Sequence, residues 1–140
     1  MEIEFIHLNK DWNAEPNAPE EKILLDNSDL LVLEFTVNPW AYSGFEEEER
    51  ARVIFTSPKK YRLGPTNDEG WYIGQCRYKK LAPKWGEFYQ VIGSSSTISE
   101  ADDWVNVSSA GGPNNFLFYL RDSTFECQAE SYEFQKNKDS

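Results

Sequence analysis

Apolar and polar residues alternate one by one along several stretches of this sequence, and no long stretch has the 3.6-residue period of an amphipathic helix. The alternation is clearest at 30–38, where one set of alternate positions is entirely apolar: Leu31, Leu33, Phe35 and Val37. Successive side chains of a strand point to opposite sides, so this pattern predicts a strand with one face in the core.

Further strands are expected at 2–8, 50–56, 71–80, 85–93, 104–107, 116–121 and 124–134. The Pro, Gly, Asn and Ser residues between these stretches are typical of turns. Strands spaced in this way predict an all-β fold, an antiparallel sandwich or a partly closed barrel of about seven or eight strands.

We expect at most one or two short helical turns. A turn after Pro19, within a long surface connection at 9–22, is left open. Another is left open within 40–49, where Ser43 and Glu46 have the spacing of a capping box. In 124–134 the alternation of Phe125, Cys127 and Ala129 with acidic and amide residues predicts one buried and one solvent-exposed face.

The chain of 140 residues has the size of a single domain, which we expect at 1–135 with a frayed tail at 136–140. There is no signal-peptide pattern, and no apolar run approaches the roughly 18 residues of a membrane span. We therefore expect a soluble, cytoplasmic protein. In that compartment Cys76 and Cys127 are expected to be buried free thiols, although a disulfide remains open if their strands adjoin.

No residue set predicts a catalytic or metal site. His7 is the only histidine, and no nucleophile is spaced for it to activate. One histidine and two distant cysteines do not form a zinc site, and the acidic stretches lack the pattern of a calcium loop. No catalytic residue, metal or cofactor is expected. A carboxylate pair contributed by two strands remains open, because sequence spacing does not reveal it.

Charge is distributed unevenly along the chain, whose net charge is −10. Residues 1–49 carry 13 acidic and 2 basic residues, 50–92 carry 3 and 9, and 93–140 carry 8 and 3. The middle segment interleaves basic and aromatic residues, as single-strand nucleic-acid sites do. The acidic whole disfavours a polyanion, so we expect these cations to pair with acids of their own fold.

The five tryptophans all lie in expected loops or at expected strand ends: Trp12, Trp40, Trp71, Trp85 and Trp104. Some are expected to plug the core, and others to line a ligand pocket at the end of the sandwich. The candidate ligand-binding residues are Trp40, Tyr42, Trp71, Arg77, Lys79 and Trp85.

These observations favour a binding domain without catalytic activity. A protein partner is the first hypothesis, and a basic one fits best, since an acidic protein can be steered onto it as inhibitor or immunity-type proteins are. The alternatives are a carbohydrate or small-anion binding module and a glycoside hydrolase-like enzyme that uses a carboxylate pair. The sequence leaves the oligomeric state open.

Overall fold

The computed structural model describes residues 4–15, 19–40, 42, 44–64, 87–92, 104–120 and 123–136. These residues form ten strands and no helix: β1 Glu4–His7, β2 Lys22–Asp26, β3 Leu30–Thr36, β4 Arg50–Thr56, β5 Lys60–Gly64, β6 Phe88–Ile92, β7 Val105–Asn106, β8 Asn114–Tyr119, β9 Thr124–Ala129 and β10 Ser131–Lys136. The predicted all-β class is confirmed. Within this part of the chain there is no helix long and apolar enough to cross a membrane.

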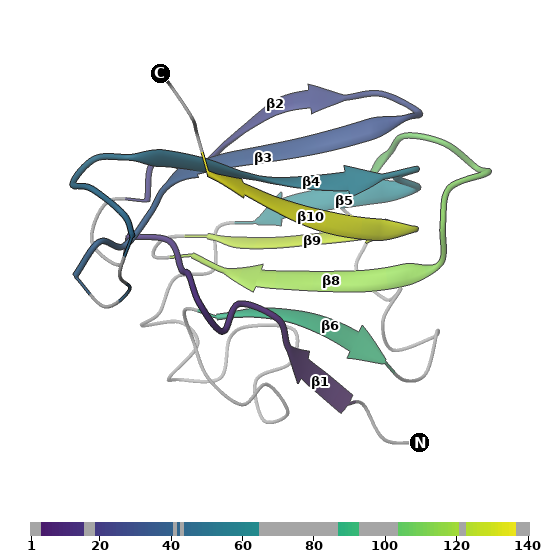
Figure 1. Ribbon diagram of the computed structural model, residues 1–140. Coiled ribbons are helices and arrows are strands. Elements are labelled where there is room, and N and C mark those ends of the chain that lie inside the picture. The colour runs from purple at the N-terminus through teal and green to yellow at the C-terminus, as the bar shows by residue number, and fades with distance from the viewer. Residues whose placement is uncertain are drawn as a thin grey trace.

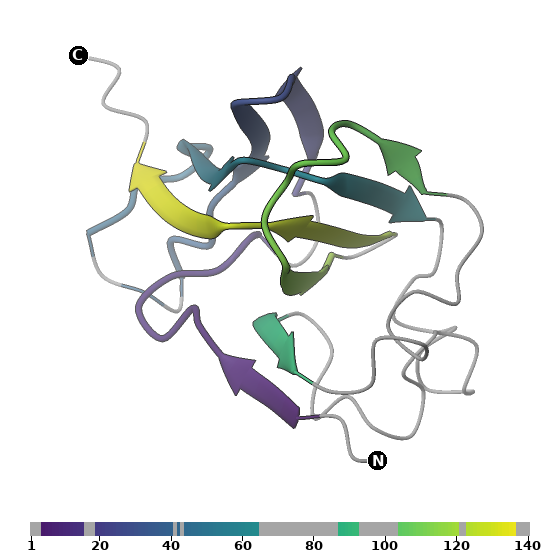
Figure 2. The same ribbon diagram turned by 90° about the vertical axis from the view of Figure 1, so that its right-hand side faces the viewer.

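The strands form two antiparallel sheets, which face each other in Figure 1 and are turned by 90° in Figure 2. One sheet has the order β1-β6-β8-β9-β5-β7, and the other has the order β10-β4-β3-β2. Neither closes into a barrel, so the structure is sandwich-like, which was one of the two expected architectures.

The two sheets are joined at a corner where the chain passes twice from one sheet to the other. The stretch 124–134, expected as one strand, is divided at Glu130 into β9 and β10, which belong to different sheets. The second crossing lies beside it, where the chain leaves β4 in one sheet and enters β5 in the other. The Glu130 amide donates to the Thr56 carbonyl at 2.8 Å, and the Lys59 amide donates to the Gln128 carbonyl at 2.7 Å. These bonds keep the two crossings paired through the corner.

Gly111 and Gly112 pack against this corner, backbone to backbone. A Cβ atom on Gly112 would lie 2.3 Å from the backbone of Glu130, and one on Gly111 would lie 2.5 Å from the backbone of Lys59. The Gly112 amide also donates to the Ser57 carbonyl at 2.9 Å. The glycine pair in the sequence is therefore explained by a close approach of three backbone segments.

The core lies between the sheets and follows the predicted alternation. The side chains of Leu31, Leu33, Phe35 and Val37 are fully buried, as are Ala51, Val53 and Phe55 on β4. Aromatic rings fill much of the space, and Trp12 stacks on Phe134 with the ring centroids 4.2 Å apart. Trp12 is thus one of the core plugs expected among the tryptophans. Cys127 is buried as a free thiol, and burial raises its pKa well above the ordinary value; Cys76 lies outside the described residues.

Two local expectations are wrong. The stretch 9–22 is not a surface connection throughout, because Asn9, Trp12 and Ala14 are buried and β2 begins at Lys22. Asn9 joins distant segments: its amide donates to the Trp12 carbonyl and its oxygen accepts from the Phe88 amide. The described residues 19–21 and 44–49 form no helical turn, which agrees with the expected upper limit of one or two.

The second wrong expectation is the solvent-exposed face of β9. Glu126 lies on that face but is buried, and its carboxylate is 2.6 Å from the Arg62 guanidinium on β5. Leu117 and Tyr119 on the neighbouring β8 are buried on the same side. This sheet is therefore buried on both faces at its centre, and a charge pair accommodates the one acid there.

Candidate functional site

A pocket of about 690 Å³ opens on the outer face of the four-stranded sheet, where β2 begins, β3 ends and β4 begins. Three lining residues come from these strands, and the others come from the loops that precede β2 and follow β3. The lining consists of Glu15, Glu20, Lys22, Thr36, Pro39, Trp40, Glu47, Glu48 and Arg50.

Backbone pairing at the end of β3 brings these loops together. Thr36 accepts a hydrogen bond from the Glu15 amide at 2.8 Å and donates one to the Pro19 carbonyl at 2.7 Å. On the other side the Val37 amide donates to the Glu49 carbonyl at 2.9 Å. The loop before β2 and the loop before β4 are therefore held on either side of one strand end, which leaves a hollow between them.

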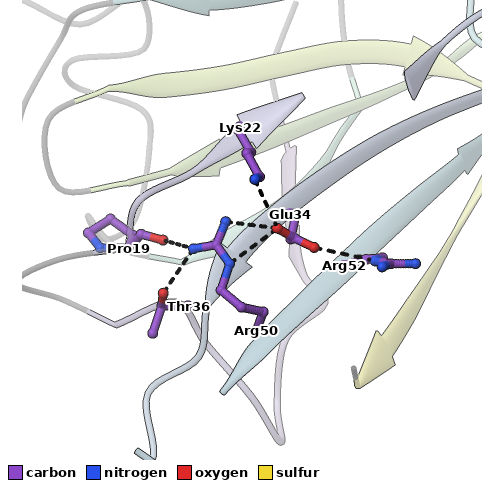
Figure 3. Close-up of polar contacts among 6 residues, drawn as sticks. All are labelled: Pro19, Lys22, Glu34, Thr36, Arg50 and Arg52. Carbon is purple, nitrogen blue, oxygen red and sulfur yellow. Dashed lines mark hydrogen bonds and ion pairs between the residues drawn. The ribbon is translucent and has the colours of Figure 1, made fainter. Parts of the chain in front are cut away.

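Figure 3 shows an ion-pair cluster that is centred on the Glu34 carboxylate and includes the pocket-lining residues Lys22 and Arg50. Glu34 is mostly buried, and three cations surround it: Arg50 at 3.0 Å, Arg52 at 3.5 Å and Lys22 at 3.7 Å. Cross-strand register explains the arrangement, because Glu34 stands opposite Lys22 on β2 and Arg52 on β4. Opposite charges in facing positions stabilise an antiparallel pair.

Arg50 makes the largest number of bonds in this cluster. Its guanidinium donates twice to Glu34, and it also donates to the Thr36 hydroxyl at 2.9 Å and the Pro19 carbonyl at 3.3 Å. The two cations that line the pocket, Lys22 and Arg50, are thus both directed at Glu34. The acidic side chains dominate the remaining lining.

Four glutamates supply this acidity. Among the described residues none forms an ion pair with Glu20, Glu47 or Glu48. Glu20 and Glu48 also hold left-handed backbone conformations, with φ of 46° and 63°. Non-glycine residues adopt this region at a cost of about 1–2 kcal/mol each. Two of the residues that carry the charge of the pocket are therefore held in a strained backbone conformation.

Trp40 is the aromatic residue of the pocket, with 69% of its surface exposed. Its amide donates to the Asn38 side chain at 3.0 Å, and Pro39 lies between the two residues. This turn holds the backbone of Trp40 beside the end of β3, while the indole stays accessible to a ligand.

Of the six predicted ligand-binding residues, Trp40 alone is placed at the pocket by the described structure. Tyr42 does not line it. Its pKa is raised by burial and by the charge of Glu87, while a hydrogen bond with Asn13 acts in the opposite direction, so Tyr42 belongs to a different neighbourhood. Trp71, Arg77, Lys79 and Trp85 lie outside the described residues.

The described cations of the basic middle segment are largely engaged within the fold. Arg50 and Arg52 pair with Glu34, Arg62 pairs with Glu126, and the Lys60 ammonium lies 4.5 Å from the ring centre of Trp104. These four cations therefore have partners within the fold, whereas Arg77, Lys79, Lys80 and Lys84 of the same segment lie outside the described residues.

His7 and the pocket acids show no arrangement for nucleophilic or metal chemistry in the part of the chain that is described. His7 Nε2 lies 2.8 Å from the Glu87 carboxylate, and no described Ser or Cys side chain bonds to the ring. No group of three or more His, Cys, Asp or Glu side chains among these residues is placed to hold a metal ion.

Five residues of the pocket are not among those predicted from the sequence: Glu15, Glu20, Lys22, Glu47 and Glu48. The acidic run at 46–49 is also typical of the start of a short helix, and nothing in its local pattern indicates the rim of a pocket. Comparisons of the chain with protein-family models, with curated proteins and with solved structures find no match.

Proposed function

We propose that this protein is a binding domain that holds a basic segment of a partner protein, with an arginine or lysine side chain of that segment in the Trp40 pocket. One observation carries the proposal: an exposed indole borders a pocket rich in carboxylates, whose two cations are turned toward Glu34.

The dimensions of the pocket support a ligand of side-chain or short-peptide size. Its volume of about 690 Å³ lies within the range of small-ligand sites. It is formed by loops that are hydrogen-bonded to a strand end, so ligand binding requires little ordering of the chain.

The charge balance supports a cation as that ligand. The lining has four glutamates against Lys22 and Arg50, and those two cations share Glu34. A guanidinium entering beside Glu47 and Glu48 would meet carboxylates able to accept paired hydrogen bonds. The net charge of −10 adds long-range attraction that speeds the encounter with a basic partner.

Trp40 supports the same choice. A cation over the face of an indole gains about 0.5–1 kcal/mol at an exposed site, and more once the contact is desolvated. Tryptophan and arginine are also the residues most enriched among those that dominate binding energy in protein interfaces.

The test is calorimetric titration of the protein with a short arginine-containing peptide and with the same peptide carrying glutamine in place of arginine. We expect binding of the first alone, weakened by salt because exposed charges are screened. Trp40→Ala and the double variant Glu47→Gln/Glu48→Gln should each weaken it about tenfold or more. Glu4→Gln removes one charge on β1, at the far side of the molecule from β2 (Figure 1), and should leave it unchanged. Equal binding of both peptides would refute the proposal.

A carbohydrate is the second candidate, because an exposed indole beside carboxylates can also stack on a sugar ring and accept from its hydroxyl groups. Titration with neutral oligosaccharides separates the two candidates. Sugar binding that is insensitive to salt and lost in Trp40→Ala would favour this second function over the first.

A further inference from the structure

β2 is an open edge of the four-stranded sheet. Among the described residues it pairs with β3 alone, and it lies at the outer margin of the molecule (Figures 1 and 2). Four of its five residues are exposed, and Ile23 is partly buried. An exposed strand edge presents unpaired amide and carbonyl groups that another strand can bind.

This edge also exposes two leucines in succession. In a regular strand, adjacent side chains would point to opposite faces and one would enter the core. The pairing with β3 shifts register between Ile23 and Leu25, so Leu24 has no partner residue opposite it. As a result Leu24 and Leu25 are 42% and 41% exposed. Covering such an apolar edge with another surface removes the two leucines from water, which is favourable.

The charges of β2 are arranged so that the strand complements itself. Its first residue is Lys22 and its last is Asp26, with three apolar residues between them. If two copies lie antiparallel about a twofold axis at Leu24, each Lys22 faces the Asp26 of the other copy. A twofold contact requires this kind of self-complementarity, and facing opposite charges favour it.

Both charged groups remain able to make this contact. The Lys22 side chain is 60% exposed, and its ammonium is 3.7 Å from Glu34, a loose pair. Asp26 accepts a hydrogen bond from the Tyr61 hydroxyl through Oδ2 at 2.7 Å, which leaves Oδ1 for a cation.

We propose that two copies of this chain associate through β2, antiparallel and centred on Leu24, to form one continuous sheet across both. The bulges of the two copies meet at the axis, so the contact relies on the leucines and the two charge pairs more than on a long hydrogen-bond ladder. The inference goes beyond the proposed function. Because Lys22 also lines the pocket, each dimer carries one Trp40 pocket at either end of the joined strands, which suits a partner with two basic segments.

Sedimentation equilibrium of the intact chain from micromolar to millimolar concentration tests the proposal. The wild type should show a monomer–dimer equilibrium. Leu24→Lys should abolish it, whereas Ile6→Lys, which changes an equally exposed apolar residue on β1, should leave it unchanged. Thermal unfolding of each variant verifies that it is folded.

Charge reversal tests the antiparallel register. Lys22→Asp and Asp26→Lys each place like charges opposite one another in the homodimer, so each variant alone should be monomeric. In an equimolar mixture every facing pair is again of opposite charge, and the mixed dimer should form. The double variant Lys22→Asp/Asp26→Lys should also dimerise. A wild type that stays monomeric would overturn the proposal, and a strand of another protein would then be the expected partner of this edge. A mixture that stays monomeric would overturn the antiparallel register. Neither result bears on peptide binding at Trp40, which calorimetry measures separately.

Discussion

The guanidinium of Arg50 donates two hydrogen bonds to one carboxylate oxygen of Glu34, through Nε at 3.2 Å and Nη2 at 3.0 Å. This pair joins β3 to the first residue of β4, and Arg50 also donates to the Pro19 carbonyl, so the guanidinium ties the loop before β2 to the sheet. Arg52 and Lys22 share the same carboxylate.

Loss of the Glu34 charge should therefore destabilise the fold. Glu34→Gln leaves three neighbouring cations without their common anion, and removal of one partner of a largely buried pair costs about 3 kcal/mol. Urea unfolding should register this loss as a lower midpoint with an unchanged slope. Glu133→Gln, an exposed change on β10 of the same sheet, is the matched control. An equal effect of the two substitutions would contradict the role given to Glu34.

The corner between the sheets should tolerate no side chain at Gly112. A Cβ there would meet the Glu130 backbone at 2.3 Å, so one of the two backbone segments would have to shift. Gly112→Ala should lower the free energy of unfolding by about 3 kcal/mol, as overpacking does. In Gly64→Ala the new Cβ lies nearest to the side-chain end of Arg62, at 3.2 Å, rather than to backbone, and the change should cost less than about 1 kcal/mol. Similar losses in both variants, measured by urea unfolding, would argue against the close approach.

Alkaline pH should weaken the fold through Tyr61. Burial, the hydrogen bond to Asp26 and the negative charge of Asp26 raise the pKa of Tyr61 to about 12 from an ordinary value of 10. Between pH 10 and 12 the unfolded chain releases this proton and the folded chain retains it, so stability is full below pH 10 and falls across that interval. Tyr89, whose pKa is also raised to about 12, contributes in the same direction.

Tyr61→Phe has no phenol to ionise at this position. Its unfolding midpoint should fall less steeply above pH 10 than that of the wild type, although it starts lower because the bond to Asp26 is lost. Parallel pH profiles of the two proteins would show that Tyr61 does not titrate in this way.

A substitution at Glu48, whose backbone is left-handed, should affect peptide binding and stability in different ways. Glycine adopts a φ of 63° without strain, so Glu48→Gly should unfold at the same denaturant concentration as the wild type or gain about 1 kcal/mol, while it binds the arginine peptide less tightly. Glu47→Gly removes the same charge where φ is not positive, and should lose both stability and binding. A stabilised Glu48→Gly that binds as well as the wild type would remove this carboxylate from the site.

Alternation predicted the fold class and the core faces because it reports which side of a strand is apolar. It did not predict β2, where Ile23, Leu24 and Leu25 follow one another without alternation. It also did not reveal that the chain changes sheets at Glu130, since a strand that crosses a corner keeps the same local pattern in both sheets. The burial of Glu126 was missed because alternation does not show what covers the polar face.

Of the candidate site, the sequence predicts Trp40 but not the residues that tertiary pairing brings beside it. Trp40 was selected because a large aromatic residue after a strand end is a frequent ligand contact. Glu15 and Glu20 reach the same pocket through backbone pairing of their loop with Thr36, which no local sequence pattern encodes. Lys22 is turned toward Glu34 by cross-strand register, which is likewise a tertiary property.

The indole N–H signal of Trp40, assigned in a ¹H–¹⁵N spectrum by its disappearance in Trp40→Phe, tests the central claim most directly. Titration with the arginine peptide should shift this signal saturably, with the same dissociation constant as calorimetry gives, while the signal of the buried Trp12 stays in place. A peptide that binds without moving the Trp40 signal, or that moves it no more than its glutamine counterpart does, would contradict the assignment of this pocket to a basic partner.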